Sequence, residues 1–110
     1  STGSAIDAEG RAQYLTLLGN AGHVDATLAM MAEWKLDALL ARLPRQTVPC
    51  LLITSGGDVA VPPAISQKAA ARLPAGEWAS IPRYGHLVHE ENAASVAALI
   101  LPFLAAHCLP

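Results

Sequence analysis

One apolar run, residues 48–54, constrains the fold of this chain more than any other segment. It reads Val48-Pro49-Cys50-Leu51-Leu52-Ile53-Thr54 and is followed by Ser55 and the pair Gly56-Gly57. A short apolar run without alternation, ended by glycines, is typical of a β-strand that is buried on both faces. Strands of this kind belong to parallel sheets that are covered by helices on both sides. The run therefore predicts an α/β fold.

The residues after this run predict a helix, a second strand and a second helix. Pro62-Pro63 opens the first helix, residues 77–81 form a short strand, and residues 82–89 form a loop before Asn92 caps the last helix. A strand–helix–strand unit of this length implies parallel strands. Two strands do not make a stable sheet, so we expect the first one to continue a parallel sheet from the missing N-terminal part of the same fold.

Residues 1–45 predict helices only. Asp7 is the expected cap of a first helix that ends at Gly19, and helical spacing of apolar residues predicts further helices over residues 23–34 and 36–43, the last stopped by Pro44. Met31 and Trp34 belong to the second of these helices. They are expected either to pack in a core or to form the wall of an apolar pocket.

Composition and charge exclude several classes of protein. Apolar residues make up 53% of the chain, which is high for 110 residues and indicates a piece of a larger core. The net charge of −2 is scattered, with no basic stripe, so no nucleic-acid partner is expected. The longest apolar stretch, residues 93–106, is shorter than the roughly 20 residues that span a bilayer.

The ends of the chain and its cysteines bear on its processing and location. The chain opens at Ser1 without an initiator methionine or a signal peptide, which indicates a truncated or processed product. Its two cysteines, Cys50 and Cys108, do not make a disulfide framework and suit a reducing compartment. The expected location is the cytoplasm.

Two residues with catalytic chemistry follow the two predicted strands. Asp58 lies just past the first strand and His86 just past the second. The carboxyl ends of parallel strands meet at one edge of a sheet, and neighbouring strands are about 4.8 Å apart, so the Asp58 carboxylate can reach the His86 imidazole. Such a carboxylate would hold the tautomer of His86, which could then act as a general base. The alternative is two loop residues without contact.

Three short motifs resemble the acid and histidine signatures in the C-terminal portion of α/β hydrolases. They are Val48-Pro49-x-Leu51-Leu52-Ile53, Gly57-Asp58-x-x-Val61-Pro62 and Ile81-Pro82-x-x-Gly85-His86-x-x-His89-Glu90-Glu91. Matched residue by residue, the resemblance places the acid of a catalytic triad on Asp58 and its histidine on His86. Ser55 departs from the pattern, because many relatives have glycine there, and Pro102 is a second, mild departure.

The helical part resembles one branch, the magnesium-chelatase accessory proteins of bacteriochlorophyll biosynthesis. The matching motifs are Thr2-Gly3-Ser4-x-Ile6-Asp7 and His23-Val24-Asp25-x-Thr27-Leu28-Ala29-Met30-Met31-Ala32-x-Trp34-x-Leu36-Asp37-x-Leu39-Leu40. The resemblance implies a helical cap or lid segment with connecting helices over residues 1–45 and the C-terminal part of the hydrolase core over residues 46–110. It also implies an upstream serine on a G-x-S-x-G elbow. No such elbow occurs in these 110 residues, so this chain lacks the nucleophile.

Three functions remain open. In the intact protein, Asp58 and His86 would serve ester or acyl-type hydrolysis of a small molecule, with Tyr84, Leu87, Met31 and Trp34 as candidate pocket residues. Alternatively, the same scaffold is a noncatalytic accessory protein that binds a tetrapyrrole or a protein partner. A third alternative is a free-standing interaction module that dimerises through its open strand edge.

No cofactor or metal is expected. His86, His89 and Glu90 lie close in the sequence, but no third and fourth ligand for zinc stand at suitable spacing, and no carboxylate cluster suits magnesium. Glu90 and Glu91 are instead expected to favour the N-terminus of the last helix through its dipole.

Overall fold

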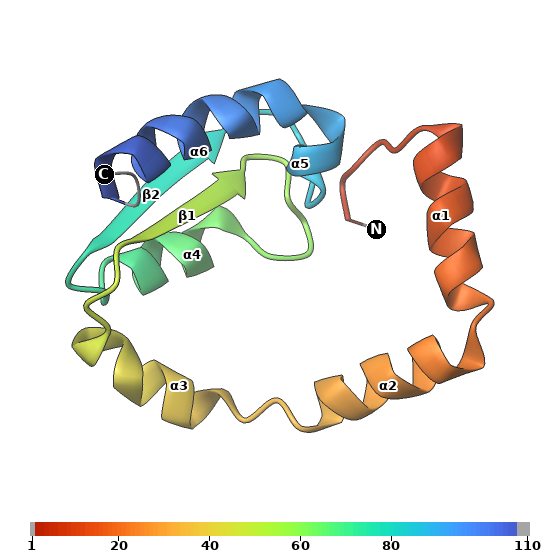
Figure 1. Ribbon diagram of the computed structural model, residues 1–110, viewed down its shortest axis with the longest axis horizontal. Helices are drawn as coiled ribbons and strands as arrows, with labels where there is room; N and C mark the ends of the chain where they lie inside the picture. The colour runs from red at the N-terminus through yellow and green to blue at the C-terminus, as the bar shows by residue number, and fades with distance from the viewer. Residues whose placement is uncertain (1, 108–110) are drawn as a thin grey trace. The chain divides into compact units, whose positions relative to one another are not determined.

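The computed structural model describes residues 2–107, so Cys108 lies outside the described residues. In chain order, the elements are α1 (Ala8–Leu18), α2 (Ala21–Ala32), α3 (Leu36–Arg42), the 3₁₀ turn η1 (Leu43–Arg45), β1 (Cys50–Ser55), α4 (Pro63–Ala70), β2 (Gly76–Ile81), α5 (Val88–Glu91) and α6 (Ala93–His107) (Figure 1). The chain forms two compact units. Residues 6–41 make one, and residues 42–107 make the other together with residues 2–5.

The helices of the first unit begin at side-chain caps. The Asp7 carboxylate accepts the Gly10 N–H at 2.8 Å, as predicted, and Gly19 caps the C-terminal end of α1 after Leu18. The Asn20 side chain accepts the His23 N–H at 3.0 Å, so α2 begins at Ala21, two residues earlier than predicted. α3 ends at Arg42, just ahead of Pro44, which lies within η1.

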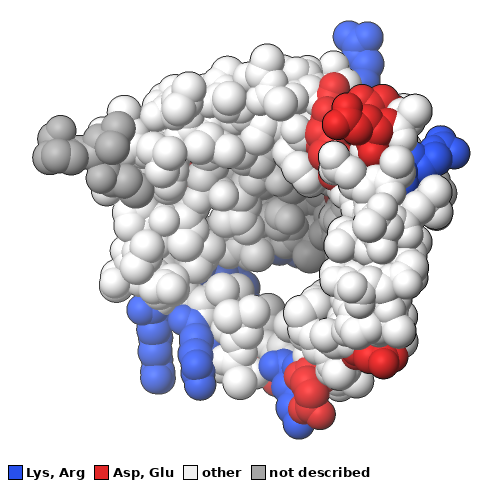
Figure 2. All heavy atoms as spheres, turned by 45° about the vertical axis from the view of Figure 1, so that its right-hand side comes forward, with Lys and Arg blue, Asp and Glu red and all other residues white. Residues whose placement is uncertain are grey.

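The apolar side chains of this helical unit are largely exposed. No residue of α1, α2 or α3 is buried, and both Leu18 and Trp34 are more than 60% exposed. Most of the face drawn in Figure 2 carries neither acidic nor basic side chains. These helices therefore have apolar surface still available for contact.

The second unit is built on two parallel strands. β1 and β2 are hydrogen-bonded neighbours in a register that runs from Cys50 opposite Gly76 to Ser55 opposite Ile81. α4 connects them and lies on one side of the pair, whereas α6 lies on the other (Figure 1). This arrangement confirms the predicted α/β class and the parallel crossover. β1 begins at Cys50 because Pro49 has no N–H, and the first ladder bond runs from Cys50 N–H to Ala75 C=O at 2.9 Å.

The core of this unit is small. Its buried apolar residues are Ala70, Ile81 and Val88, and the polar residues Thr54 and Ser55 are buried at the end of β1. Thr54 is satisfied, since its hydroxyl accepts the Trp78 indole N–H at 3.1 Å. The middle of β1 is only half-buried, so the predicted burial on both faces is not reached within residues 2–107.

α6 is the most apolar of these helices and contains Pro102. Within the described part of the chain, no helix combines the length and the hydropathy that crossing a membrane requires.

Candidate functional site

The two strands deliver Asp58 and His86 to the same edge of the sheet. Asp58 lies in the loop after β1 and His86 in the loop after β2, and the register places the last residues of both strands opposite each other. The structure brings the two side chains together, with Asp58 Oδ2 and His86 Nδ1 2.8 Å apart. The Asp58 side chain is only 9% exposed, whereas the imidazole is 40% exposed. The carboxylate is therefore sheltered while the ring remains accessible from solvent.

The two oxygens of Asp58 have different partners. Oδ1 accepts the backbone N–H groups of Ala60 and Val61, both at 2.8 Å, and Oδ2 faces His86. Partial burial raises the pKa of Asp58, but the hydrogen bonds from Val61, His86 and Ala60 together outweigh this effect and hold the pKa below its usual value. The carboxylate is thus ionised at neutral pH. An ionised carboxylate can only accept hydrogen bonds, so the proton between the two side chains lies on His86 Nδ1. The other ring nitrogen, Nε2, is then free to take a proton.

The loop before His86 is anchored through the carbonyl oxygen of Tyr84. This oxygen accepts the Gly57 N–H at 2.9 Å and also the hydroxyl of Ser55. A Cβ on Gly57 would lie 2.6 Å from it, so this position requires glycine. Ser55, the departure from the hydrolase pattern, is 1% exposed and joins the two loops through its hydroxyl.

The segment 2–5 contacts the same loop, which sequence reasoning missed. The His86 N–H donates to Thr2 C=O at 2.9 Å, and the Leu87 N–H donates to Ser4 Oγ at 2.7 Å. The Glu91 carboxylate accepts the N–H groups of Ala5 and Gly85 at 2.9 and 2.8 Å. No local signal could have found these contacts, because Ala5 and Glu91 are 86 positions apart.

The structure gives the Glu91 carboxylate hydrogen-bond partners that the sequence did not predict. Glu91 is the last residue of the short helix α5, and its carboxylate is occupied by the two backbone N–H groups from other segments. The N-terminus of α6 is instead capped by Asn92, as predicted, whose side chain accepts the Ser95 N–H at 3.2 Å.

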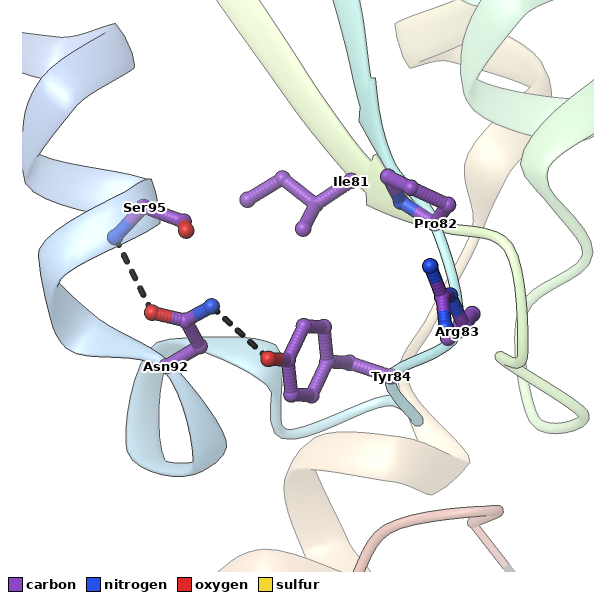
Figure 3. A pocket seen from close by; sticks show the side chains of 6 residues that line it. All are labelled: Ile81, Pro82, Arg83, Tyr84, Asn92 and Ser95. Atoms are coloured by element: carbon purple, nitrogen blue, oxygen red, sulfur yellow. Dashed lines mark hydrogen bonds between the residues drawn. The ribbon is translucent and has the colours of Figure 1, made fainter.

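A cavity of about 510 Å³ lies beside the His86 loop, and Tyr84 forms part of its wall (Figure 3). Its other lining residues are Ile81, Pro82, Arg83, Asn92 and Ser95. The Tyr84 hydroxyl accepts a hydrogen bond from the Asn92 amide at 2.9 Å, which fixes the ring. The lining includes neither Asp58 nor His86, nor the predicted pocket residue Leu87.

The other two predicted pocket residues lie in the helical unit. Met31 lines a cavity of about 210 Å³, together with Leu18, His23, Val24, Thr27 and Leu28. Trp34, just beyond α2, is 61% exposed. Among residues 2–107, no cluster of three or more His, Cys, Asp or Glu side chains is arranged to hold a metal ion.

Comparison with known proteins identifies relatives of this chain. No protein-family model matches it. The magnesium-chelatase 30 kDa subunit of Rhodobacter capsulatus is 45% identical over 103 residues, which are 94% of this chain and 36% of that subunit. This chain is a relative of that subunit. The resemblance stated from the sequence is thereby confirmed, and the chain spans about a third of the length of this relative.

Two further proteins are similar to this chain. RutD of Yersinia enterocolitica, which is named for a carbamate hydrolase activity, is 36% identical over 62 residues, covering 56% of this chain and 22% of RutD. The structure of Rv0554 from Mycobacterium tuberculosis matches 92% of this chain and 44% of its own chain, with a TM-score of 0.62 and 25% identity. The fold of this chain therefore matches part of a longer solved structure.

Arg83 adopts a backbone conformation that suits glycine, with φ of 76°. A left-handed conformation costs a residue with a side chain about 1–2 kcal/mol. We expect Arg83→Gly to raise the free energy of unfolding by about 0.5–1 kcal/mol, because relief of this cost exceeds the added entropy of the unfolded chain. Urea denaturation measures the change. The matched control, Arg11→Gly within α1, should lower stability by about 1 kcal/mol, and equal losses in both variants would contradict the expectation.

Acidification should weaken the site through two carboxylates. Hydrogen bonds lower the pKa of Glu91, from Ala5 first and then from Gly85 and Ser4, and the pKa of Asp58 is also lowered. Groups with a depressed folded-state pKa stabilise the protein above the unfolded pKa of about 4, and this contribution is lost as pH falls through the lower folded value. We expect the urea midpoint to decrease below about pH 4. The decrease should be smaller in Glu91→Gln and in Asp58→Asn, and an unchanged midpoint in the wild type would disprove it.

Proposed function

We propose that this chain supplies the acid, Asp58, and the base, His86, of a serine-hydrolase-type site in a larger α/β-hydrolase-like protein. This protein would be of the magnesium-chelatase accessory type found in bacteriochlorophyll biosynthesis. The observation that carries the proposal is the 2.8 Å contact between Asp58 Oδ2 and His86 Nδ1. The similarity to RutD, a protein named as a hydrolase, supports it. The scarcity of cysteines favours the cytoplasm as the location.

In this proposal His86 moves a proton and Asp58 orients it. Nε2 takes the proton from a serine hydroxyl as the oxygen attacks an ester or acyl-type carbonyl, and later gives it to the leaving group. The Asp58 carboxylate stabilises the imidazolium formed in between. The nucleophile and the oxyanion hole come from residues outside these 110. Ser55 does not serve as the nucleophile, since its hydroxyl is buried and donates a hydrogen bond to Tyr84 C=O.

A second candidate is a noncatalytic accessory protein that binds a tetrapyrrole. The name of the relative that is 45% identical favours it, because that protein is called a magnesium-chelatase subunit and not a hydrolase. The exposed apolar side chains of α2, together with the cavity lined by Met31, offer surface for a flat apolar ligand. In this case Asp58 and His86 would be kept only as part of the scaffold.

Ester hydrolysis separates the two candidates. The protein is extended by the residues that precede this segment, and hydrolysis of a panel of p-nitrophenyl esters is compared in the wild type, His86→Ala and His89→Ala. His89 is the matched control because its imidazole lies 3.6 Å from Glu90 and is not paired with Asp58. We expect loss of hydrolysis only in His86→Ala. Equal rates in the three proteins would refute the proposal, and saturable protoporphyrin binding without hydrolysis would favour the second candidate.

A further inference from the structure

We infer that Glu91 is a positioning residue that holds the His86 loop against residues 2–5 and thereby sets the orientation of the imidazole toward Asp58. This inference rests on the proposed function, because it assigns a part in the same acid–base site. Glu91 acts through the backbone, because its carboxylate accepts the N–H of Gly85, directly before His86, and the N–H of Ala5 in the segment that the His86 loop contacts.

Three successive backbone N–H groups around His86 are all hydrogen-bonded to this assembly. Gly85 donates to Glu91 Oε2 at 2.8 Å, His86 donates to Thr2 C=O at 2.9 Å, and Leu87 donates to Ser4 Oγ at 2.7 Å. The donors lie directly before, at and after the imidazole-bearing residue. The backbone torsions that aim the ring are therefore constrained from both sides.

The second oxygen of Glu91 fixes the other side of the contact. Oε1 accepts the Ala5 N–H at 2.9 Å, and the Ser4 hydroxyl donates to the same carboxylate. Ser4 is thus bonded both to Glu91 and to Leu87. One carboxylate joins two segments that are distant in sequence, and its removal would release both.

Residues 3 and 4 also pack between the two loops of the site. A Cβ on Gly85 would lie 2.2 Å from the Ser4 nitrogen, and a Cβ on Gly3 would lie 2.3 Å from the Gly57 carbonyl oxygen. Gly3 has φ of 76°, which glycine adopts without strain. This segment therefore contacts the loop that carries Asp58 as well as the loop that carries His86. The hydrogen bonds of the Glu91 carboxylate to Ala5 and Gly85, called the Glu91 clamp below, therefore set the spacing of both loops.

The charge of Glu91 favours this role. Hydrogen bonds from Ala5, Gly85 and Ser4 lower the pKa of Glu91, so the carboxylate is ionised at neutral pH. Hydrogen bonds to an ionised acceptor are about twice as strong as neutral ones. The neighbouring Glu90 carries the same charge on α5, but its carboxylate faces His89 at 3.6 Å. Glu90 is therefore a matched control.

The test is NMR of the full chain, comparing wild type with Glu91→Gln and Glu90→Gln. In the wild type, we expect a His86 Nδ1 proton protected from exchange and a protected Gly85 amide. In Glu91→Gln, Gly85 amide exchange should rise about tenfold and the Nδ1 proton signal should broaden or vanish. Amides of β1 should keep their protection, which shows that the fold persists, and Glu90→Gln should match the wild type. Unchanged His86 and Gly85 signals in folded Glu91→Gln would overturn the inference.

A second variant and a second readout complete the test. If Glu91→Gln does not fold, Ser4→Ala removes the shared hydroxyl and should also weaken the Nδ1 proton signal, and an unchanged signal there overturns the inference. In the longer protein, Glu91→Gln should lower kcat about ten- to hundredfold with little change in KM. If the His86 Nδ1 proton signal is lost in Glu91→Gln but the wild-type longer protein hydrolyses no ester, the proposed function is refuted. The positioning role of Glu91 would then still stand. Hydrolysis by the wild type with no effect of Glu91→Gln on either readout would refute the clamp alone.

Discussion

Asp58→Asn is expected to lower kcat/KM for ester hydrolysis by the longer protein by about 10⁴-fold. The structure gives a local reason. Asp58 Oδ1 accepts the N–H groups of Ala60 and Val61, so the carbonyl oxygen of an asparagine would face these donors and its NH₂ group would face His86 Nδ1. Nδ1 would then have to accept, and the ring proton would move to Nε2, where the general base needs a free lone pair.

Steady-state kinetics with Asp58→Asn and a matched control measure this effect. The control is Asp37→Asn, which removes the same charge in the first turn of α3. The loop should stay folded in Asp58→Asn, because the asparagine oxygen keeps both backbone bonds. A loss below about tenfold, or an equal loss in both variants, would show that Asp58 does not set the tautomer of His86.

Gly76→Ala is expected to destabilise the protein by about 2–3 kcal/mol. A Cβ at this position would lie 2.4 Å from the Ala70 carbonyl oxygen and 2.7 Å from the Leu73 Cβ. These atoms belong to or sit close to the backbone at the end of α4, so they cannot move aside as a flexible side chain would. Gly76 also opens β2 opposite Cys50, so a shift there disturbs the start of the strand pair.

Urea denaturation compares Gly76→Ala with Gly22→Ala. Gly22 lies within α2, where a Cβ would meet only the Asn20 Oδ1 at 3.4 Å, so this substitution should stabilise the protein by about 0.5–1 kcal/mol. The two changes add the same methyl group and should have opposite signs. Equal midpoints would contradict the close packing of β2 against α4.

The strands and the pairing of Asp58 with His86 could be predicted because both follow from short-range signals and from topology. Glycines and prolines mark the ends of the strand–helix–strand unit, and parallel strands necessarily bring the loops after β1 and β2 to one edge. The predicted first residues of α2 and β1 differ from the observed ones, because a single side chain decides where each element begins. Asn20 caps α2, which therefore begins at Ala21 and not at residue 23, and Pro49 delays β1 by two residues.

The support of the site could not be predicted. Ala5 and Glu91 are 86 positions apart, and no periodicity connects residues 2–5 with the His86 loop. The positive φ of Arg83 was also beyond reach, since arginine gives no signal for a left-handed conformation. Ser55 could be noticed as a departure from the hydrolase pattern, but its bond to Tyr84 C=O depends on the folded loops.

The high apolar content fits a two-stranded sheet whose apolar surface is only partly covered within residues 2–107. Among the described residues, three apolar side chains are buried, and the middle of β1 is half-exposed. Both outer edges of the strand pair lack another strand within residues 2–107. The remaining strands of the predicted sheet would cover this surface, and the relative from Rhodobacter capsulatus has nearly two-thirds of its length outside the matched segment.

Labelling of the longer protein with a fluorophosphonate, followed by mapping of the modified residue by mass spectrometry, tests the central claim most directly. The claim that Asp58 and His86 serve a serine nucleophile predicts a label on one serine outside these 110 residues, lost in His86→Ala and retained in His89→Ala. A folded wild-type protein that takes up no label, or a label that persists in His86→Ala, would contradict the claim.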